Sequence, residues 1–381
     1  MGKTVLLIRG VASGNYGGGE SYQLKLAGQL EKNGFKPVII TSSLKLVSEA
    51  EGRKFEVIKM PYCHRQNWSG WKNLLFPMYF IWQIRLRRWY KKIFKKYHPA
   101  AINIQSRDDW IAATVVAKKM NIKILWTDHM DFRSWALTNV NVWYKNLIGK
   151  WVLSEMRKAD AVIMISDFER KWFEKQVSPK KFNNVETIKN GVCDEYVRYK
   201  EIKKIENSFC YVGRIVDYKG VRELLMAFGL VLGKKSKAKL NIYGDGDLKK
   251  YITMINNGVE LHGYTSNPLD VMAENEIFVL PSYREGLSLS LLDAAMMGKK
   301  IIASDVDGNP EVVVDKKTGL LVPAKNVERL AEAMLYMLEN KKEAGEMAKN
   351  ARQYYEENFD FEKIFKEKML PLYNSDKEEN K

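Results

Sequence analysis

The choice of folds for this chain is narrowed most by residues 281–305, PSYREGLSLSLLDAAMMGKKIIASD. The apolar run before them predicts a strand that ends at Leu280, and the turn that follows carries Glu285. A helix is predicted to begin near Ser288, with a second carboxylate, Asp293, eight residues past Glu285. Free backbone N–H groups at a helix start bind phosphate, and acidic side chains beside them can bind hydroxyls. We therefore expect a ligand in which a diphosphate joins hydroxyl-rich groups, as in a nucleotide-sugar, although a plain strand–helix unit with surface charges also fits.

Strands and helices alternate along the whole chain. The predicted strands of the first half are TVLLIR, KPVIIT, AINIQ, IKILWT, AVIMIS and VETI, and those of the second half are SFCYVGR, KLNIYG, VELHG, EIFVLP, KIIAS and GLLVP. Such alternation predicts an α/β protein with parallel, doubly wound sheets. We expect one domain over residues 1–193, a polar linker over 194–206, a second domain over 207–359, a last helix over 360–373 and a disordered tail over 374–381.

Composition fits a globular protein of two ordinary domains, with 381 residues of which 46% are hydrophobic. Three cysteines, Cys63, Cys193 and Cys210, show no paired spacing, which indicates a reducing compartment. The first apolar run is too short for a secretory signal, and no run of about 18 apolar residues is present to span a bilayer. We therefore expect a cytoplasmic protein.

The segment with Glu285 and Asp293 resembles the E-x7-E signature of retaining family-4 glycosyltransferases, which have the two-domain GT-B fold. Further motifs agree in order and spacing over nearly the whole chain: GGGE at 17–20, NGV at 190–192, GRIVDYKG at 213–220, YGDGDL at 243–248, GNPEVV at 308–313 and TGLLVP at 318–323. The resemblance implies two Rossmann-like domains facing across a cleft, with acceptor-side residues in the first domain and nucleotide-sugar-binding residues in the second. It also implies that the last helix packs back on the first domain.

Arg214 and Lys219, in the frame GR-x4-KG, resemble the diphosphate site of this family. A planar guanidinium and a mobile ammonium suit a diphosphate, and cations placed at a leaving group stabilise the transition state more than the ground state. In a chain of net charge +16, two ordinary surface cations remain the alternative. By the same resemblance Glu285 binds the donor sugar and Asp293 the ribose. The family usually has Glu at the position of Asp293, so we expect a weaker or water-mediated ribose contact here.

His129 follows the predicted strand IKILW, where the family often has a histidine beside the donor sugar; a structural histidine is the alternative. The glycine loop before the first helix allows close approach of a phosphate or sugar, or is simply a flexible turn. The implied catalytic set is Arg214, Lys219, Glu285 and His129. The implied donor-binding positions are Gly18, Gly19, Gly244, Gly263, Tyr264, Gly286, Leu287, Ser288 and Asp293.

Two D-x-D triplets, Asp245–Asp247 and Asp305–Asp307, have the spacing of metal ligands but lie in motifs that the family does not use for metal. We expect no metal site and no cofactor. The resemblance also implies retention of the anomeric configuration by a front-face mechanism, without a carboxylate nucleophile.

Basic residues are concentrated between Val57 and Arg107, a stretch that contains no Asp or Glu. One helical face within this stretch consists of Trp82, Leu86, Trp89, Ile93 and Tyr97. We expect this face to pack on the first sheet, although an interfacial helix is an alternative. The candidate surface for a membrane or an acceptor consists of Trp68, Trp71, Phe76, Phe80, Arg85 and Arg88. Such a surface attracts an anionic leaflet. No nucleic-acid-binding motif accompanies the charge, so we expect peripheral association with the inner face of the cell membrane and no nucleic acid partner.

The sequence thus predicts a retaining, metal-independent glycosyltransferase of the hexosyltransferase type. It would move a sugar from a nucleoside-diphosphate-sugar to a hydroxyl of a glycan or lipid-linked acceptor, in cell-surface polysaccharide or glycolipid assembly. One alternative is a catalytically lapsed scaffold that binds nucleotide-sugar or membrane, with the shortened Asp293 as its support. Another is a GT-B phosphorylase or epimerase, although epimerases lack the combination of GR-x4-KG and E-x7-E.

Overall fold

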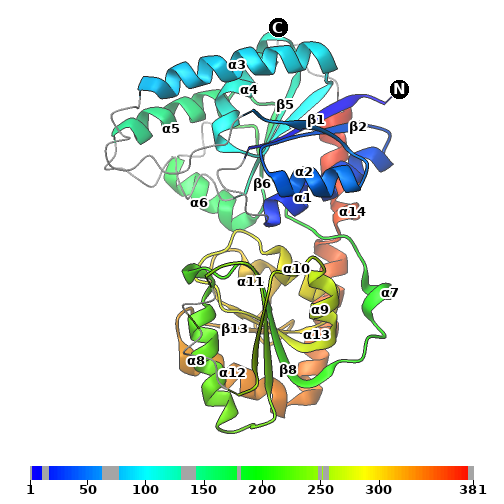
Figure 1. The fold of residues 1–381 in the computed structure, drawn as a ribbon, viewed down its shortest axis with the longest axis vertical. Helices are drawn as coiled ribbons and strands as arrows, with labels where there is room; N and C mark the ends of the chain where they lie inside the picture. The colour runs from blue at the N-terminus through cyan, green and yellow to red at the C-terminus, as the bar shows by residue number, and fades with distance from the viewer. Residues whose placement is uncertain are drawn as a thin grey trace. The chain divides into compact units, whose positions relative to one another are not determined.

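The computed structural model describes residues 2–10, 17–61, 77–129, 143–177, 182–247, 251 and 257–375. The chain divides into two compact units, Met1–Ile188 with Phe365–Lys381, and Lys189–Ile364 (Figure 1). Each unit is a parallel sheet with helices on both faces, so the predicted fold of two Rossmann-like domains is confirmed. Within the described ranges, no helix is long and apolar enough to cross a membrane.

The first unit contains a seven-stranded sheet in the order β3-β2-β1-β4-β5-β6-β7. Its strands are β1 (Thr4–Arg9), β2 (Lys36–Thr41), β3 (Glu56–Lys59), β4 (Ala101–Ile104), β5 (Lys123–Asp128), β6 (Ala161–Met164) and β7 (Val185–Thr187). Its helices are α1 (Gly18–Lys32), α2 (Leu44–Gly52), α3 (Pro77–Tyr97), α4 (Arg107–Lys119), α5 (Trp143–Met156) and α6 (Asp167–Val177). The strand order reverses between β1 and β4, and ligands of open parallel sheets bind outside the carboxyl ends of the strands at such a point.

The sheet of the first unit is apolar on both faces, because helices cover both of them. Residues Val5 to Ile8 of β1 are fully buried. Trp110 of α4 stacks on Trp126 of β5 with ring centroids 5.1 Å apart, and the Trp126 indole N–H donates to Thr114 at 2.9 Å. Large rings therefore bind α4 to the sheet with their polar atoms satisfied.

The apolar stripe predicted on α3 does pack on the core, but the most buried face of the helix is rotated from it. Of the stripe, Leu86 is buried and the others are half-buried at the margin. The buried face consists of Tyr79, Gln83, Leu86, Tyr90 and Phe94. Tyr90 is accommodated in the interior because its hydroxyl donates to the buried Asp109 carboxylate at 2.6 Å.

The second unit contains a six-stranded sheet in the order β10-β9-β8-β11-β12-β13. Its strands are β8 (Ile205–Val212), β9 (Lys239–Tyr243), β10 (Val259–Gly263), β11 (Asn275–Leu280), β12 (Lys300–Ser304) and β13 (Leu320–Val322). Its helices are α7 (Tyr196–Tyr199), α8 (Val221–Leu232), α9 (Pro268–Glu274), α10 (Leu289–Met296), α11 (Asn309–Val312), α12 (Val327–Glu339), α13 (Lys341–Asn358) and α14 (Phe361–Ile364), with a 3₁₀ turn at Asp217–Lys219. Helices α8 and α12 lie on one face of this sheet, and α9 and α13 on the other (Figure 1).

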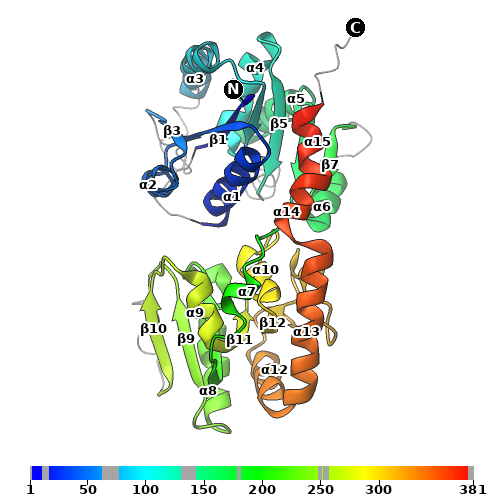
Figure 2. The same cartoon turned by 90° about the vertical axis from the view of Figure 1, so that its right-hand side faces the viewer.

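The last helical segment differs in detail from the single helix predicted over 360–373. It consists of α14, a π-helical turn at Phe365–Met369 and α15 (Leu370–Asn374), and the last two belong to the first unit (Figure 2). Tyr373 accepts a hydrogen bond from Asn103 of β4 at 2.9 Å, and the Ser375 carbonyl accepts one from Lys123 of β5 at 2.6 Å. Helical structure thus continues into the predicted tail at Asn374, and residues 376–381 lie outside the described ranges.

Candidate active site

Two loops meet at the carboxyl edge of the second sheet, because β8 and β11 are adjacent parallel strands. The loop after β8 ends at Lys219, and the loop after β11 carries Glu285. The Lys219 Nζ lies 2.5 Å from the Glu285 Oε1, with side chains only 13% and 8% exposed. Two predicted catalytic residues, far apart in sequence, therefore form one partly buried ion pair.

Backbone contacts hold these two loops together independently of the ion pair. The Tyr283 N–H donates to the Tyr218 carbonyl at 2.7 Å. Gly220 has a φ of 70°, and a Cβ on it would lie 2.1 Å from the Pro281 carbonyl oxygen. The motif glycine after Lys219 is thus required both by its left-handed backbone and by the close approach of the neighbouring loop.

A third loop, after β12, supports Glu285 from the other side. The Asp307 carboxylate accepts a hydrogen bond from the Glu285 N–H at 2.9 Å. A Cβ on Gly308 would lie 1.8 Å from the Gly286 carbonyl oxygen, so the two loops touch through backbone atoms. Asp307, which the sequence offered only as part of a D-x-D triplet, is therefore a positioning residue for Glu285. Among the described residues, no group of three or more His, Cys, Asp or Glu is arranged to hold a metal ion.

Helix α10 begins beside Glu285, and its N-cap residue, Ser288, makes no side-chain hydrogen bond to the first amides of the helix. Uncapped N–H groups at a helix start attract an anion. Gly286, Leu287 and Ser288 are buried in the loop before it. Asp293 lies in the second turn of α10 and is half-buried.

Arg214 is exposed at the same edge of the sheet, and its Nη2 donates to the Tyr218 hydroxyl. A hydrogen bond from the interior fixes its backbone, because the buried Tyr211 hydroxyl donates to the Arg214 carbonyl at 2.7 Å. Burial raises the pKa of Tyr211 well above its ordinary value, so it stays a neutral donor.

The predicted glycines after β9 and β10 continue this edge. A Cβ on Gly244 would lie 1.8 Å from the Gly213 carbonyl oxygen, and the Gly244 N–H donates to the Gly263 carbonyl at 2.7 Å. Gly263 has a φ of 73°, and the following Tyr264 is 49% exposed. The structure therefore brings most of the predicted donor-binding residues to the carboxyl edge of one sheet.

The remaining predicted residues, Gly18, Gly19 and His129, lie in the first unit at the carboxyl edge of its own sheet. Gly19 makes room for a side chain of the same unit. A Cβ on Gly19 would lie 2.1 Å from the Arg9 guanidinium, which donates to Glu20 at 2.8 Å. Burial alone would raise the pKa of Glu20, but the Arg9 charge and hydrogen bonds hold it below its usual value. Arg9 and Glu20 were not singled out from the sequence, although GGGE contains the glutamate.

His129 follows β5 and contacts Tyr22 edge-on, with ring centroids 4.9 Å apart. Its Nε2 is buried and has no hydrogen-bond partner among the described residues. Burial, and then the charge of Arg9, lower the pKa of His129 well below 6.5. The imidazole is therefore neutral near pH 7.

The candidate membrane surface is described only in part, since Trp68, Trp71 and Phe76 lie outside the described residues. Phe80 of α3 is 41% exposed and stacks on Trp151 of α5 at 5.3 Å, and Arg85 and Arg88 are exposed. Among the described residues of these two helices, further exposed apolar side chains are Met78, Ile81 and Ile84 on α3 and Leu147 on α5.

Family models match nearly the whole chain in two parts. Residues 194–354 match the model "Glycosyl transferases group 1", and residues 16–196 match "Glycosyltransferase Family 4". The chain belongs to these glycosyltransferases. The loops that meet at Lys219 and Glu285 lie within the group 1 match, and the glycine loop and His129 within the family 4 match.

Curated relatives carry sugar-transferase names. The poly(ribitol-phosphate) alpha-N-acetylglucosaminyltransferase of Staphylococcus aureus is 27% identical over 59% of this chain and 46% of its own length. The N,N'-diacetylbacillosaminyl-diphospho-undecaprenol alpha-1,3-N-acetylgalactosaminyltransferase of Campylobacter jejuni is 32% identical over 43% of each chain. This glycosyltransferase thus spans less than half the length of these two relatives.

Among solved structures, HepE of Anabaena in complex with UDP-glucose superposes with a TM-score of 0.74, covering 97% of this chain and 99% of that chain at 16% identity. At this identity the likeness bears on the fold alone. It shows that both parallel-sheet units of this glycosyltransferase have counterparts in a known GT-B structure.

Proposed function

We propose that the protein is a retaining, metal-independent glycosyltransferase that moves a sugar from a nucleoside-diphosphate-sugar to a hydroxyl of a glycan or lipid-linked acceptor. The setting we propose is the assembly of cell-surface polysaccharide or glycolipid. The observation on which this depends is the Lys219–Glu285 pair beside the uncapped start of α10. A cation, a carboxylate and a helix start therefore lie together, which supports the binding of a diphosphate and of sugar hydroxyls.

In this proposal the donor diphosphate contacts Arg214, Lys219 and the first amides of α10, while Glu285 binds sugar hydroxyls and Asp293 approaches the ribose. The diphosphate offers Lys219 a new anionic partner, which releases the Glu285 carboxylate for the sugar. As the anomeric bond breaks, the leaving diphosphate gains negative charge, and cations already in place stabilise it. These cations supply the positive potential that a divalent metal would otherwise provide.

Retention follows from a front-face reaction. The anomeric carbon–oxygen bond to phosphate breaks, the acceptor oxygen bonds to the same face, and the departing phosphate oxygen takes the acceptor proton. No carboxylate nucleophile is needed, because in this proposal the Glu285 carboxylate, once released from Lys219, binds sugar hydroxyls. A neutral His129 acts by hydrogen bonding to a sugar hydroxyl rather than by carrying a proton.

The names of the relatives support this setting. The Staphylococcus aureus relative is named for a polymeric acceptor, and the Campylobacter jejuni relative for a diphospho-undecaprenol acceptor. HepE, which shares the fold, was solved with UDP-glucose, so the fold is compatible with a nucleotide-sugar donor.

A thermal-shift panel of UDP, GDP, ADP and their sugar conjugates tests the proposal with wild type and Lys219→Ala. A ligand that binds only the native state raises the melting temperature. We expect one nucleoside diphosphate to shift the wild type and not the variant, and turnover to yield a product with the donor's anomeric configuration in the presence of EDTA. Binding without turnover on any acceptor would favour the lapsed scaffold.

We also propose that α3 holds the protein on an anionic leaflet from the cytoplasmic side. On this helix, exposed apolar side chains come shortly before exposed cations. The apolar side chains are Phe80, Ile81 and Ile84, and the cations are Arg85 and Arg88. Apolar residues beside cations fit the interface of an anionic bilayer, where each basic residue contributes about 1 kcal/mol.

Co-sedimentation with vesicles of rising anionic lipid content tests this surface. We expect binding to rise with anionic lipid and to fall in Ile81→Glu. Leu230→Glu is the matched control, because Leu230 is 51% exposed on α8 of the second unit. Binding that does not depend on anionic lipid would contradict the proposal.

A further inference from the structure

The ring of Tyr218 is surrounded by three cations. The Arg214 Cζ and the Lys219 Nζ each lie 5.9 Å from its centroid, and the Arg284 Cζ lies 5.6 Å from it. Arg214 and Lys219 belong to the loop after β8, whereas Arg284 belongs to the loop after β11. The Tyr218 ring therefore contacts cations from both loops of the candidate active site.

The charges around this ring are not balanced by the protein. Lys219 is paired with Glu285, but in the part of the chain that the structure describes neither Arg214 nor Arg284 has a carboxylate partner. The Asp307 carboxylate, which accepts the Glu285 N–H, pairs with neither arginine. Both arginines are exposed, so a ligand can reach them. A diphosphate diester carries two negative charges, one for each of these two arginines.

The backbone around the ring is held in place. The Tyr218 carbonyl accepts the Tyr283 N–H at 2.7 Å, and its hydroxyl accepts a hydrogen bond from Arg214. Arg284 lies between two residues whose amides are both engaged, since the Glu285 N–H donates to Asp307 at 2.9 Å. Among the described residues the Arg284 guanidinium makes no hydrogen bond or ion pair and packs on the Tyr218 ring, so the face of that ring sets where the guanidinium rests.

We propose that Arg284 is a third phosphate-binding cation of this site, and that Tyr218 is the positioning residue that holds Arg284 and Arg214 toward the phosphates. The inference depends on the proposed function, because the diphosphate is that of the donor. It extends that function to two residues to which no role was assigned from the sequence. Lys219 already has a carboxylate partner in Glu285. The positive charges of Arg214 and Arg284 are therefore the ones that the donor diphosphate neutralises.

Calorimetric titration with UDP, GDP and ADP tests the proposal, first on wild type and then on Arg284→Gln and Arg284→Lys. We expect Arg284→Gln to weaken the binding of the preferred nucleoside diphosphate by about ten- to a hundredfold, the range of a lost charge-assisted hydrogen bond. Arg284→Lys recovers part of the affinity, because it keeps the charge but not the planar fork.

Tyr218 is tested by two replacements. Tyr218→Leu removes the ring and is expected to weaken binding about three- to tenfold through loss of cation–π contacts. Tyr218→Phe keeps the ring and loses only the hydrogen bond to Arg214, so we expect a smaller effect. Competition by inorganic pyrophosphate gives a second readout, because damage confined to the nucleoside site would leave pyrophosphate binding unchanged.

Lys235→Gln is the control, since Lys235 lies in the turn between α8 and β9, at the opposite edge of the sheet, in an exposed ion pair with Glu339. If wild type binds none of the three nucleoside diphosphates, the proposed function is wrong and this inference with it. If wild type binds one and Arg284→Gln binds it as tightly as Lys235→Gln does, only the present inference is overturned.

Discussion

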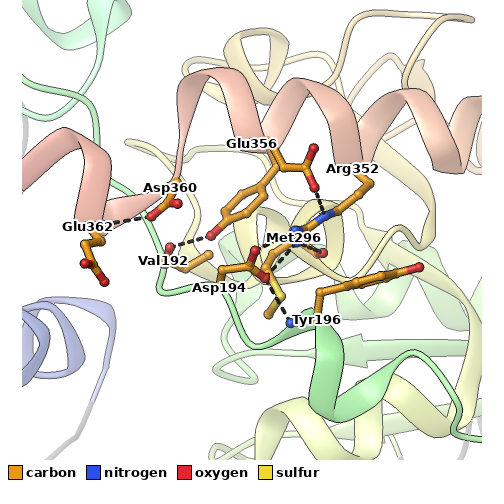
Figure 3. A network of polar contacts seen from close by, with 9 residues as sticks. Val192, Asp194, Tyr196, Met296, Arg352, Glu356, Asp360 and Glu362 are labelled. Carbon is orange, nitrogen blue, oxygen red and sulfur yellow. Dashed lines mark hydrogen bonds and ion pairs between the residues drawn. The ribbon is translucent and has the colours of Figure 1, made fainter.

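Arg352 of α13 binds Asp194 through two parallel contacts, Nη1 to Oδ1 at 2.9 Å and Nη2 to Oδ2 at 2.5 Å (Figure 3). The same guanidinium donates to the Met296 carbonyl at 2.7 Å and to Glu356 at 2.7 Å. One turn further along α13, the Tyr355 hydroxyl donates to the Val192 carbonyl at 2.7 Å. The first residues of the second unit are thereby fastened to α13 and to α10, the helix that begins beside Glu285.

Replacing Arg352 should therefore destabilise the second unit. We expect Arg352→Ala to lower the free energy of unfolding by about 2 kcal/mol, because a partly buried bidentate pair and a bond to a carbonyl are lost together. Arg329→Ala is the control: Arg329 is 65% exposed in a single pair with Glu332, and such pairs contribute about 0–1 kcal/mol. Urea denaturation of both variants measures the difference, and equal losses would contradict the assignment.

The contribution of this pair should also depend on pH. The hydrogen bond from Arg352 lowers the pKa of Asp194 below its ordinary 3.8. A carboxyl with a depressed folded-state pKa stabilises the protein above its unfolded pKa, and this stabilisation is lost as pH falls through the folded value. The difference in unfolding free energy between wild type and Arg352→Ala should thus shrink below about pH 3.8. A difference that stays constant down to pH 2.5 would exclude the ion pair as its source.

His129 should make the first unit sensitive to mild acid. Burial, followed by the charge of Arg9, lowers its pKa well below 6.5, so the unfolded chain binds a proton before the folded one does. The contribution of the neutral imidazole to the free energy of unfolding is fully present above pH 6.5 and is lost as the pH falls below this value. We expect His129→Gln to lose less unfolding free energy than wild type between pH 7.5 and 5.5. Parallel losses in chemical denaturation would show that His129 is not buried in this way.

Variants of Lys219 and of Glu285 should differ in their affinity for the nucleoside diphosphate. Lys219→Ala is expected to lower kcat by about 10²–10³-fold, the range for loss of one preorganised group at a developing charge, and to weaken nucleoside diphosphate binding. Glu285→Gln should also lower kcat. It should bind the nucleoside diphosphate as tightly as wild type or more so, because Lys219 no longer has a protein carboxylate as its partner. Calorimetry with initial rates distinguishes the two; weaker diphosphate binding in Glu285→Gln would contradict the exchange of partners.

Gly308 tests the close approach of two loops. A Cβ there would lie 1.8 Å from the Gly286 carbonyl oxygen, so Gly308→Ala must move the loop that carries Glu285. We expect a loss of about 1–3 kcal/mol of stability together with weaker donor binding. Gly345→Ala, in the interior of α13 with nothing within 4 Å of its Cβ, should instead stabilise by about 0.5–1 kcal/mol. Thermal melting and donor titration compare the two, and similar behaviour would exclude the steric contact.

Local patterns predicted every strand of the two sheets except β3 (Glu56–Lys59), a short edge strand whose residues are exposed or half-buried. Runs such as TVLLIR and KLNIYG, separated by amphipathic segments, predict parallel strands, since strand and helix periodicity are properties of a few neighbouring residues. The same patterns place Arg214, Lys219 and Glu285 just after strands. Their roles as donor-binding or catalytic groups stay predictions, because they depend on the resemblance and on the experiments above.

Contacts between remote segments were decided only in three dimensions. Strand order puts β8 beside β11, and this adjacency alone brings Lys219 to Glu285, Tyr283 to Tyr218 and Arg284 over the Tyr218 ring. On α3 the buried face includes Tyr90, whose hydroxyl donates to the buried Asp109 carboxylate of α4, a partner that the pattern of α3 alone does not show. Periodicity specifies which faces are apolar, but the pairing of loops depends on which strands are neighbours and on where backbone atoms leave no room for a Cβ. These are properties of the packed sheet and not of any short stretch of residues.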